Sequence, residues 1–335
     1  MNEKHLLESV DGVVLSSPTS CYPHHTNEEK SRHNPEDLHD SIRRITTAHD
    51  QHRTTHKENT IDKHEKGEGM STVSLTLDTQ ELAQHYEHVS AAHQFEAGKI
   101  LIGELVIASG EKVLDVGSGT GLLAEYVAGL VGPSGSVVGI DPLPLRIALA
   151  QQKGRANLSF KVGTAYDLRE FPEASFDVVY LNAALHWLPE KVGPLQEIHR
   201  VLNKGGRLGI STGSKDHPLL ALKTLVLTRE PYCRYVEASG GQTYRVSEAE
   251  LESLLAQTGF TVQKMEVRPQ VHHHPSPEAA IAFAEASSFG NFLGHLPAEL
   301  RTAAREEIMR ELEQYRTPEG IRRDGARIIA VALKL

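Results

Sequence analysis

The chain has 335 residues, more than one average domain, and this length predicts one large domain with additional elements. Its 35 Lys and Arg against 44 Asp and Glu give a formal net charge of −9, so the composition provides no general electrostatic footprint for nucleic acid. The two cysteines, Cys21 and Cys233, cannot form a disulfide framework or a four-ligand zinc site, and they fit a reducing compartment.

The chain shows no pattern typical of secretion or membrane insertion. Its first residues lead into no continuous apolar stretch, so no secretory signal is visible. Apolar runs such as residues 328–333 are far too short for a membrane span. We therefore expect a cytoplasmic protein without a membrane span.

The first 70 residues differ from the rest of the chain in composition. Nine of the 19 histidines lie between Met1 and Gly69, together with many charged residues and almost no aromatic ones. Such a segment cannot bury enough apolar surface to offset its ordering entropy, so we predict a disordered tail over 1–70 and a globular domain over 71–335. Weak metal binding by the histidines of the tail is the alternative interpretation.

From Thr79 onward, helix and strand patterns alternate along the chain. Two leading helices are expected over 81–90 and 95–108, with Gly110 ending the second. The strands that follow are expected over 112–116, 136–140, 158–162, 176–182 and 207–211. The helices between them are expected over 121–131, 145–152 and 190–202, the last closed by Lys204-Gly205-Gly206. This alternation predicts a parallel sheet covered by helices on both faces.

After the fifth strand the pattern is less regular. Helices are expected over 218–227, 247–258, 276–290 and 297–315, with strands over 260–267 and 326–335. The segment from Gln270 to Gly325 is too long for a simple connection. It predicts a helical insertion over one end of the sheet.

The segment Val113–Gly121 is an apolar strand followed by glycines at alternate positions, directly before a helix. Glycine lets the backbone turn tightly and approach a ligand closely. The dinucleotide fingerprint G-x-G-x-x-G would place its third glycine at Leu122, and a P-loop would require a lysine after Gly121. The loop therefore suits a nucleoside ligand that has no pyrophosphate.

An acidic residue, Asp141, closes the second predicted strand. In a doubly wound sheet this position lies next to the glycine loop, where ligands bind. A carboxylate there can accept hydrogen bonds from both hydroxyls of a ribose. The alternative interpretation is that Asp141 and Pro142 only cap the next helix.

Residues from about 79 to 335 resemble the class I S-adenosylmethionine-dependent methyltransferases, in particular the UbiE-like type 11 group. The segments that carry this resemblance, in order, are Leu114–Gly121, Gly139–Asp141, Gly163–Leu168, Phe176–Val179 and Glu197–Gly206. The resemblance implies a doubly wound, mostly parallel, seven-stranded α/β sheet of the Rossmann-like kind. It also implies S-adenosylmethionine as cofactor, lid helices over 76–109 and an active site beneath the insertion at 270–325.

The resemblance further implies which residues contact the cofactor. Asp115 and the glycine loop would hold the methionine end, Asp141 the ribose, and Asn182 would lie beside the sulfonium. Many relatives carry an acid where Thr164 stands, which makes the adenine contact of this chain less certain. The full set of expected cofactor residues is Tyr86, Asp115, Gly117, Ser118, Gly119, Gly121, Asp141, Pro142, Thr164, Ala165, Tyr166 and Asn182.

The segment 181–189 resembles the loop after the fourth strand in trans-aconitate-type carboxyl methyltransferases. His186 would act there as the base for a hydroxyl acceptor or as a hydrogen-bond donor to a carboxylate, and Trp187 would shape the pocket. Simple packing beneath the sheet edge is the alternative for both. We expect a small-molecule acceptor, methylated on a carboxyl or hydroxyl oxygen. No metal site is expected, because His272-His273-His274 would alternate between the faces of a strand.

Several other functions are less favoured by the sequence. Quinone-type C-methylation is less favoured because relatives of that kind usually carry an Arg-Asn pair where Leu181-Asn182 stands. Arsenite methylation would need more thiolates than Cys21 and Cys233 supply. N-methylation and a non-catalytic regulator that binds the cofactor are further alternatives. An NAD-dependent oxidoreductase is disfavoured by the position of the third glycine.

Overall fold

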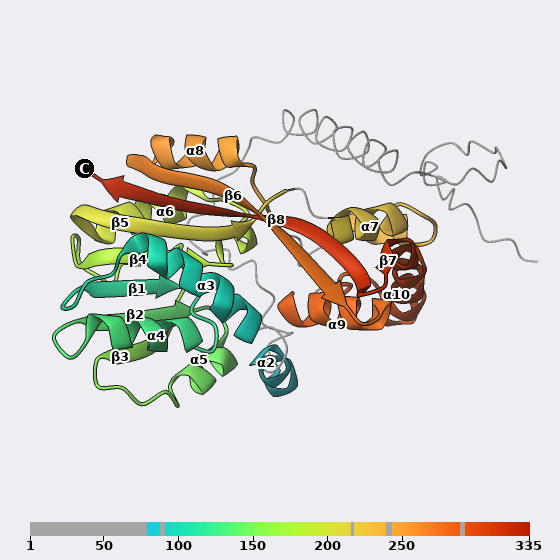
Figure 1. Ribbon diagram of the computed structural model, residues 1–335, viewed down its shortest axis with the longest axis horizontal. Coiled ribbons are helices and arrows are strands. Elements are labelled where there is room, and N and C mark those ends of the chain that lie inside the picture. The colour runs from blue at the N-terminus through green and yellow to red at the C-terminus, as the bar shows by residue number, and fades with distance from the viewer. Residues whose placement is uncertain (1–78, 88–90, 216–217, 239–242, 289–291) are drawn as a thin grey trace, which may run out of the picture.

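The computed structural model describes residues 79–87, 91–215, 218–238, 243–288 and 292–335 (Figure 1). The tail predicted over 1–70 lies outside these residues. The first strands are β1 (Lys112–Val116), β2 (Ser136–Asp141), β3 (Leu158–Val162) and β4 (Phe176–Asn182). They continue with β5 (Leu202–Gly213), β6 (Phe260–His274), β7 (Arg316–Thr317) and β8 (Gly320–Lys334).

These strands form one sheet in the order β3-β2-β1-β4-β5-β8-β6, with the two-residue β7 paired to β8. The strands β1 to β5 pair in parallel, whereas β8 is antiparallel to β5 and β6. The order reverses between β1 and β4, which creates the switch point where ligands bind in such sheets. The predicted doubly wound, mostly parallel sheet is confirmed.

Helices cover both faces of the sheet. On one face lie α3 (Ala92–Leu105), α4 (Leu122–Val131) and α5 (Pro144–Ala150), and α3 and α4 cross in front of the strands in Figure 1. On the other face lie α6 (Val192–Val201) and α8 (Glu248–Gln257).

The two cores follow from the alternation of side chains along buried strands. In β1, Val113 packs on the α3–α4 side and Leu114 on the α6–α8 side; in β4, Val178 and Val179 do the same. A strand with both faces buried therefore shows as a continuous apolar run.

A third, smaller core lies beyond the end of the sheet. It contains α7 (Pro218–Leu227), α9 (Pro277–Ser287) and α10 (Ala298–Leu312), followed by the short η5 (Glu313–Tyr315). The far ends of β6 and β8 reach toward these helices, as Figure 1 shows.

The strands β6 and β8 are longer than predicted. Residues 270–274 and 320–325, assigned to a helical insertion from the sequence, instead continue the antiparallel pairing, from Gln270 opposite Gly325 to His274 opposite Ile321. The prediction was wrong there because this part of the hairpin carries His and Arg rather than an alternation of apolar residues.

The boundary between α6 and β5 was also predicted incorrectly. The helix ends at Val201, and β5 begins at Leu202. Between the pairs Phe176–Leu202 and Val178–Arg207 the register shifts, so Lys204-Gly205-Gly206 form a bulge in the strand and do not close the helix. Gly205 has φ +77°, a conformation that suits glycine in a bulge.

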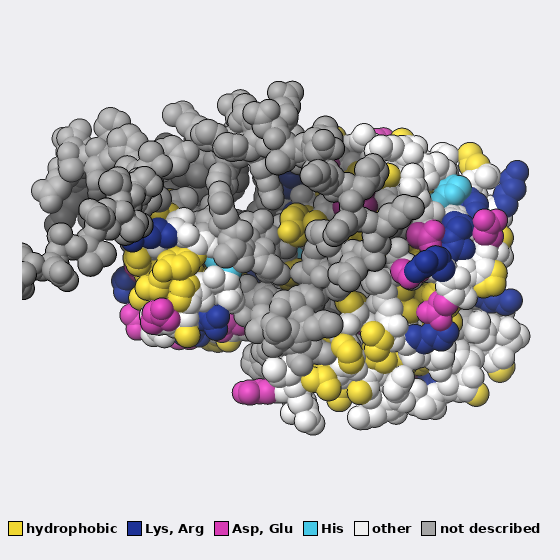
Figure 2. All heavy atoms as spheres, turned by 180° about the vertical axis from the view of Figure 1, so that it is seen from behind, with side chains coloured by type: hydrophobic (Ala, Val, Ile, Leu, Met, Phe, Trp, Pro, Cys, Tyr) yellow, Lys and Arg dark blue, Asp and Glu magenta, His cyan; other side chains and the backbone are white. Residues whose placement is uncertain are grey.

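The surface away from the viewer of Figure 1 is mixed in charge. Figure 2 shows Lys and Arg lying among Asp and Glu on the described part of this face. Among the described residues, no helix combines the length and apolar character that a membrane crossing requires.

Candidate functional site

Two neighbouring hollows lie at the carboxyl ends of the parallel strands. The first, the glycine-loop cavity, is bounded by the ends of β1, β2 and β4 and by the loop after β3. The second, the arginine cavity, lies between β8, α9 and the segment after β4. Ala183 and Trp187 line both cavities.

The glycine loop leaves β1 in a left-handed conformation. Gly117 and Gly119 have φ of +84° and +56°. The amides of Gly117 and Ser118 donate to the carbonyl oxygen of Ile140 at 2.8 and 2.9 Å, and the amide of Gly119 donates to Asp141 Oδ2 at 3.0 Å. Three successive amides are thus occupied by the end of β2. A pyrophosphate-binding loop would instead direct such amides at its ligand.

Asp141 is buried at the end of β2 and lines the glycine-loop cavity beside Pro142. Its Oδ2 accepts from Gly119, and its Oδ1 accepts from the amide of Leu143 at 3.0 Å. The bond to Leu143 ties Asp141 to the residue before α5, and the ribose role stays a prediction. Each carboxylate oxygen can accept more than one hydrogen bond, so Asp141 retains capacity for a ligand hydroxyl.

The segment after β3 forms a side wall of the glycine-loop cavity, which Thr164, Ala165 and Tyr166 line. The amide of Tyr166 donates to Thr164 Oγ1 at 3.3 Å, and its hydroxyl donates to the carbonyl oxygen of Glu190 at 2.9 Å. These bonds fix the wall on both sides of the buried Ala165.

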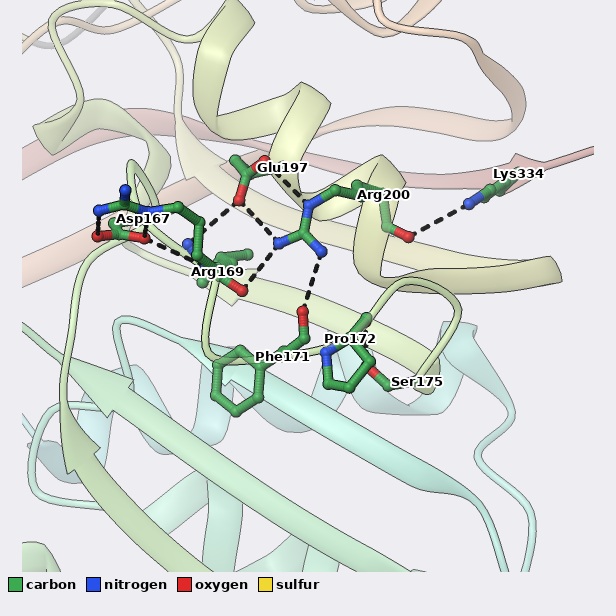
Figure 3. Close-up of polar contacts among 9 residues, drawn as sticks. Asp167, Arg169, Phe171, Pro172, Ser175, Glu197, Arg200 and Lys334 are labelled. Atoms are coloured by element: carbon green, nitrogen blue, oxygen red, sulfur yellow. Dashed lines mark hydrogen bonds and ion pairs between the residues drawn. The ribbon is translucent and has the colours of Figure 1, made fainter.

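An ion-pair network attaches this wall to α6. Figure 3 shows Arg200 at its centre, between Glu197 and Phe171. Arg200 pairs with Glu197 at 2.9 Å and donates to the carbonyl oxygens of Leu168 and Phe171 at 2.8 and 2.9 Å. Glu197 in turn accepts from the amide of Leu168 at 3.3 Å. Glu197 and Arg200 of α6 therefore anchor the segment that follows the cavity wall.

At the inner end of the glycine-loop cavity lie polar atoms without protein partners. Ser118 Oγ and Asn182 Oδ1 are buried and have no hydrogen-bond partner among the described residues. Nearby, Asp115 accepts a hydrogen bond from the hydroxyl of Tyr180 at 2.7 Å. Burial raises the pKa of Asp115 to about 7, the hydrogen bond from Tyr180 opposes this rise, and the charge of Asp141 adds to it. Such a group of buried atoms fits a polar ligand.

Ala183, between the two cavities, has φ +56°, which is strained for a residue with a side chain. Its amide donates to the carbonyl oxygen of Ser211 at 2.8 Å, which holds the segment after β4 in place. Strain of this kind is often found where a backbone must present a particular surface to a ligand.

His186 belongs to the short helix η3 (Leu185–Trp187) and lines the arginine cavity. Its Nδ1 lies 3.1 Å from Thr212 Oγ1, and its ring lies 5.2 Å from that of Trp187. Burial, together with the charges of Arg245 and Arg327, holds the pKa of His186 well below its usual range. The imidazole is therefore neutral near pH 7.

The structure brings most of the predicted cofactor residues together, but Gly121 stands apart. Gly121 lines neither cavity; a Cβ there would lie 2.5 Å from the ring of Phe160, so this glycine serves packing between α4 and β3. Tyr86 ends α2 (Gln80–Tyr86), but its side chain lies outside the described part of the structure.

The arginines of the second cavity were not found from the sequence. Arg323 and Arg327 are four residues apart in β8, and this even spacing before an apolar strand places them on one face. That spacing could have indicated from the sequence that the two arginines share a face, whereas no sequence pattern around Arg245 indicates its place in the cavity. In the neighbouring strand, His272 and His274 pack near Phe283 while His273 is exposed, as alternation predicts.

Comparison with known proteins identifies the family to which this site belongs. A family model described as a methyltransferase domain matches residues 114–210. An arsenite methyltransferase of Aquipseudomonas alcaligenes is 34% identical over 190 residues, 54% of this chain and 51% of the relative, so the chain spans about half of that relative.

Two further relatives are covered over more of their length. The O-methyltransferase cnsE of Penicillium expansum is 30% identical over 202 residues, 59% of this chain and 68% of the relative. A trans-aconitate 2-methyltransferase of Variovorax paradoxus is 26% identical over 237 residues, 69% of this chain and 87% of the relative. Among solved structures, the YcgJ protein of Bacillus subtilis matches 72% of this chain and 98% of its own at 18% identity with a TM-score of 0.51, which shows a common fold.

Proposed function

This chain belongs to the class I S-adenosylmethionine-dependent methyltransferases of the UbiE-like type, and from this premise we propose that it methylates an oxygen atom of a small-molecule metabolite, carboxyl or hydroxyl. The observation that carries the proposal is the meeting of two cavities at Ala183. One has the features that the donor requires, and the other is a separate, polar space for an acceptor.

The residues of the glycine-loop cavity fit S-adenosylmethionine. Asp141 would hold the ribose hydroxyls, and the wall at 164–166 would flank the adenine. Asp115 and the unpartnered oxygens of Ser118 and Asn182 would receive the amino-acid end. The amides that a dinucleotide would need are occupied by the end of β2, which disfavours the oxidoreductase alternative.

When bound, S-adenosylmethionine supplies an electrophilic methyl group on a positively charged sulfur. The chain contributes position and surroundings. Ala183 borders both cavities, and Asn182 donates through Nδ2 to the carbonyl oxygen of Gln94 at 3.0 Å. Holding the reacting atoms in line can contribute about 7–11 kcal/mol to lowering a barrier. His186, neutral and oriented by Thr212, would accept the proton of a hydroxyl acceptor or hydrogen-bond to a carboxylate.

Two of the relatives support an oxygen acceptor, whereas others are named demethylmenaquinone methyltransferases. One is named an O-methyltransferase and another a trans-aconitate methyltransferase. Another is named an arsenite methyltransferase. A metalloid substrate suits soft thiolate ligands, whereas this chain has two cysteines, and Cys233 lines neither cavity.

The segments at 76–109 and 270–325 would complete this site as a lid and a cover. Support for this comes from the lining of the arginine cavity, which includes Gln94 from the first segment and Phe283 and Arg323 from the second. Within this arrangement, residues 71–335 would act as one methyltransferase domain.

The test is methyl transfer from radiolabelled S-adenosylmethionine to an extract of small metabolites, with His186→Gln as the variant. We expect transfer to fall about 100-fold or more if His186 acts in proton transfer, with the affinity for S-adenosylhomocysteine unchanged. His273→Gln, at an exposed position in β6, is the matched control and should leave transfer intact. Equal rates for wild type and His186→Gln would remove His186 from the mechanism, and no transfer by the wild type would contradict the proposed activity.

A second expectation concerns the proton on Asp115. Because its pKa is about 7 in the ligand-free protein, pairing with the ammonium group of S-adenosylhomocysteine should ionise it and release a proton near neutral pH. Affinity should therefore rise as the pH increases from 6 to 8. The binding enthalpy at pH 7 should also differ between buffers that have different ionisation enthalpies.

Two controls isolate this group. Methylthioadenosine lacks the amino-acid end and should bind without proton release, and Asp115→Asn should abolish the buffer dependence for S-adenosylhomocysteine. The same enthalpy in all buffers with the wild-type protein would show that Asp115 does not meet the ammonium group.

A further inference from the structure

The arginine cavity contains three guanidinium groups from different parts of the chain. Arg323 and Arg327 lie in β8, each 7% exposed, and Arg245 lies just before α8. Arg327 donates to Ser211 Oγ at 3.0 Å and to Gln94 Oε1 at 3.2 Å. Side chains from sequence positions more than 200 residues apart thus converge on one space.

Two of these arginines are not neutralised by the described protein. No described carboxylate lies within ion-pairing distance of Arg245 or Arg323. Arg245 donates through Nη1 to the carbonyl oxygen of Ser214 at 3.3 Å, and its buried Nε has no partner. Arg323 lies over the ring of Phe283 at 5.4 Å. Asp324, the acid that lines this cavity, pairs with Arg322 on the outside.

Burying positive charges together is unfavourable unless an opposite charge accompanies them. Burial lowers the pKa of both Arg245 and Arg323 to about 10, and the neighbouring guanidinium groups of Arg323 and Arg327 contribute to the lowering at Arg245. Both remain charged at pH 7. An incoming oxyanion would offset this repulsion and satisfy the vacant donors.

We propose that the acceptor is an acid that carries an oxyanion in addition to its reacting oxygen, and that Arg245 and Arg323, with Arg327 beside them, bind this non-reacting oxyanion. The inference rests on the proposed function and specifies its substrate class. Guanidinium groups suit carboxylate and phosphate because their planar donors match two oxygens at once. The remaining wall, with Phe283, Phe292 and Leu219, accommodates a carbon skeleton.

The layout of the cavity gives the acceptor a direction. Its walls include the three arginines, His186, and the two residues Ala183 and Trp187, which also line the glycine-loop cavity. An acid bound by the arginines would therefore present a second group toward the methyl donor. A neutral acceptor, such as a quinone ring, would leave Arg245 and Arg323 without a counter-charge.

Trp187, the one tryptophan of the chain, lines both cavities and provides a fluorescence signal. In the presence of S-adenosylhomocysteine, the protein is titrated with succinate and, separately, with inorganic phosphate, at an ionic strength held constant with chloride. We expect one of the two to change the fluorescence saturably. Arg323→Gln should lower the affinity for that anion at least about tenfold, because a charged hydrogen bond is lost.

Arg322→Gln, in the neighbouring exposed position, is the matched control and should retain wild-type anion affinity. Binding of S-adenosylhomocysteine to Arg323→Gln shows that this variant is folded. Tighter binding of succinate would identify the recognised group as a carboxylate, and tighter binding of phosphate would identify a phosphate. Binding of neither anion, or equal anion affinity in Arg323→Gln and the wild type, would overturn the inference.

Methyl transfer gives an independent readout. Metabolites separated by anion exchange into acidic and neutral fractions are offered with radiolabelled donor, and activity is expected in the acidic fraction. Activity confined to the neutral fraction would also overturn the inference while leaving the proposed methyl transfer intact. Anion binding without methyl transfer to any fraction would count against the proposed function alone.

Discussion

Asp141→Ala is expected to weaken the binding of S-adenosylhomocysteine by more than about tenfold. Each charged hydrogen bond to a ribose hydroxyl contributes about 1.5–3 kcal/mol, and its loss would account for this factor. The substitution also removes the acceptor for the amide of Gly119, so the glycine loop loses its attachment to the end of β2. Calorimetric titration of the purified variant measures the effect.

The conservative variant Asp141→Asn separates the two contributions. Its side-chain oxygen can still accept from one amide, so the loop should hold its conformation better than in Asp141→Ala, while the charge is lost. We expect an intermediate affinity. Wild-type affinity in Asp141→Ala would refute the ribose role of this residue.

Gly117→Ala is expected to reduce both the stability of the protein and its affinity for S-adenosylhomocysteine. A Cβ at this position would lie 2.6 Å from Cβ of Ala184, across the wall of the glycine-loop cavity, and φ is +84°. Left-handed strain costs about 1–2 kcal/mol and overpacking about 1–3 kcal/mol. The melting temperature and the calorimetric affinity should both fall.

Gly205→Ala provides a matched control for the backbone strain. Gly205 has φ +77°, yet a Cβ there would meet nothing within 4 Å. This variant should lose stability through strain alone and bind the ligand as the wild type does. If Gly117→Ala and Gly205→Ala bound it equally well, close approach at Gly117 would not be required.

The fold could be predicted from the sequence where local patterns decide the structure. The strands β1, β3 and β4 have the predicted bounds. Most residues of β1 and β4 are apolar, and β3 alternates apolar and polar residues. The extension of β6 and β8 could not be read in the same way. Its residues pair through long-range contacts between β6 and β8. Several of them, including Arg323 and His272, line a cavity and are polar, so the sequence shows no alternation of apolar residues there.

The same distinction applies to the candidate site. The glycine loop and Asp141 are contiguous motifs, and the family that they indicated is confirmed. The arginine cavity depends on contacts between distant segments: Gln94 and Arg327, 3.2 Å apart, are separated by 233 positions in the chain. Gly121 shows that a position in a contiguous motif can also be misassigned. It was expected to contact the cofactor, and in the structure it makes room for the ring of Phe160.

The central claim is that the glycine-loop cavity holds an adenosyl amino acid, and calorimetry with the wild-type chain tests it most directly. Titration with S-adenosylhomocysteine should give saturable heat with one site per chain, whereas NAD under the same conditions should give none. Saturable binding of NAD without any heat from S-adenosylhomocysteine would contradict the account.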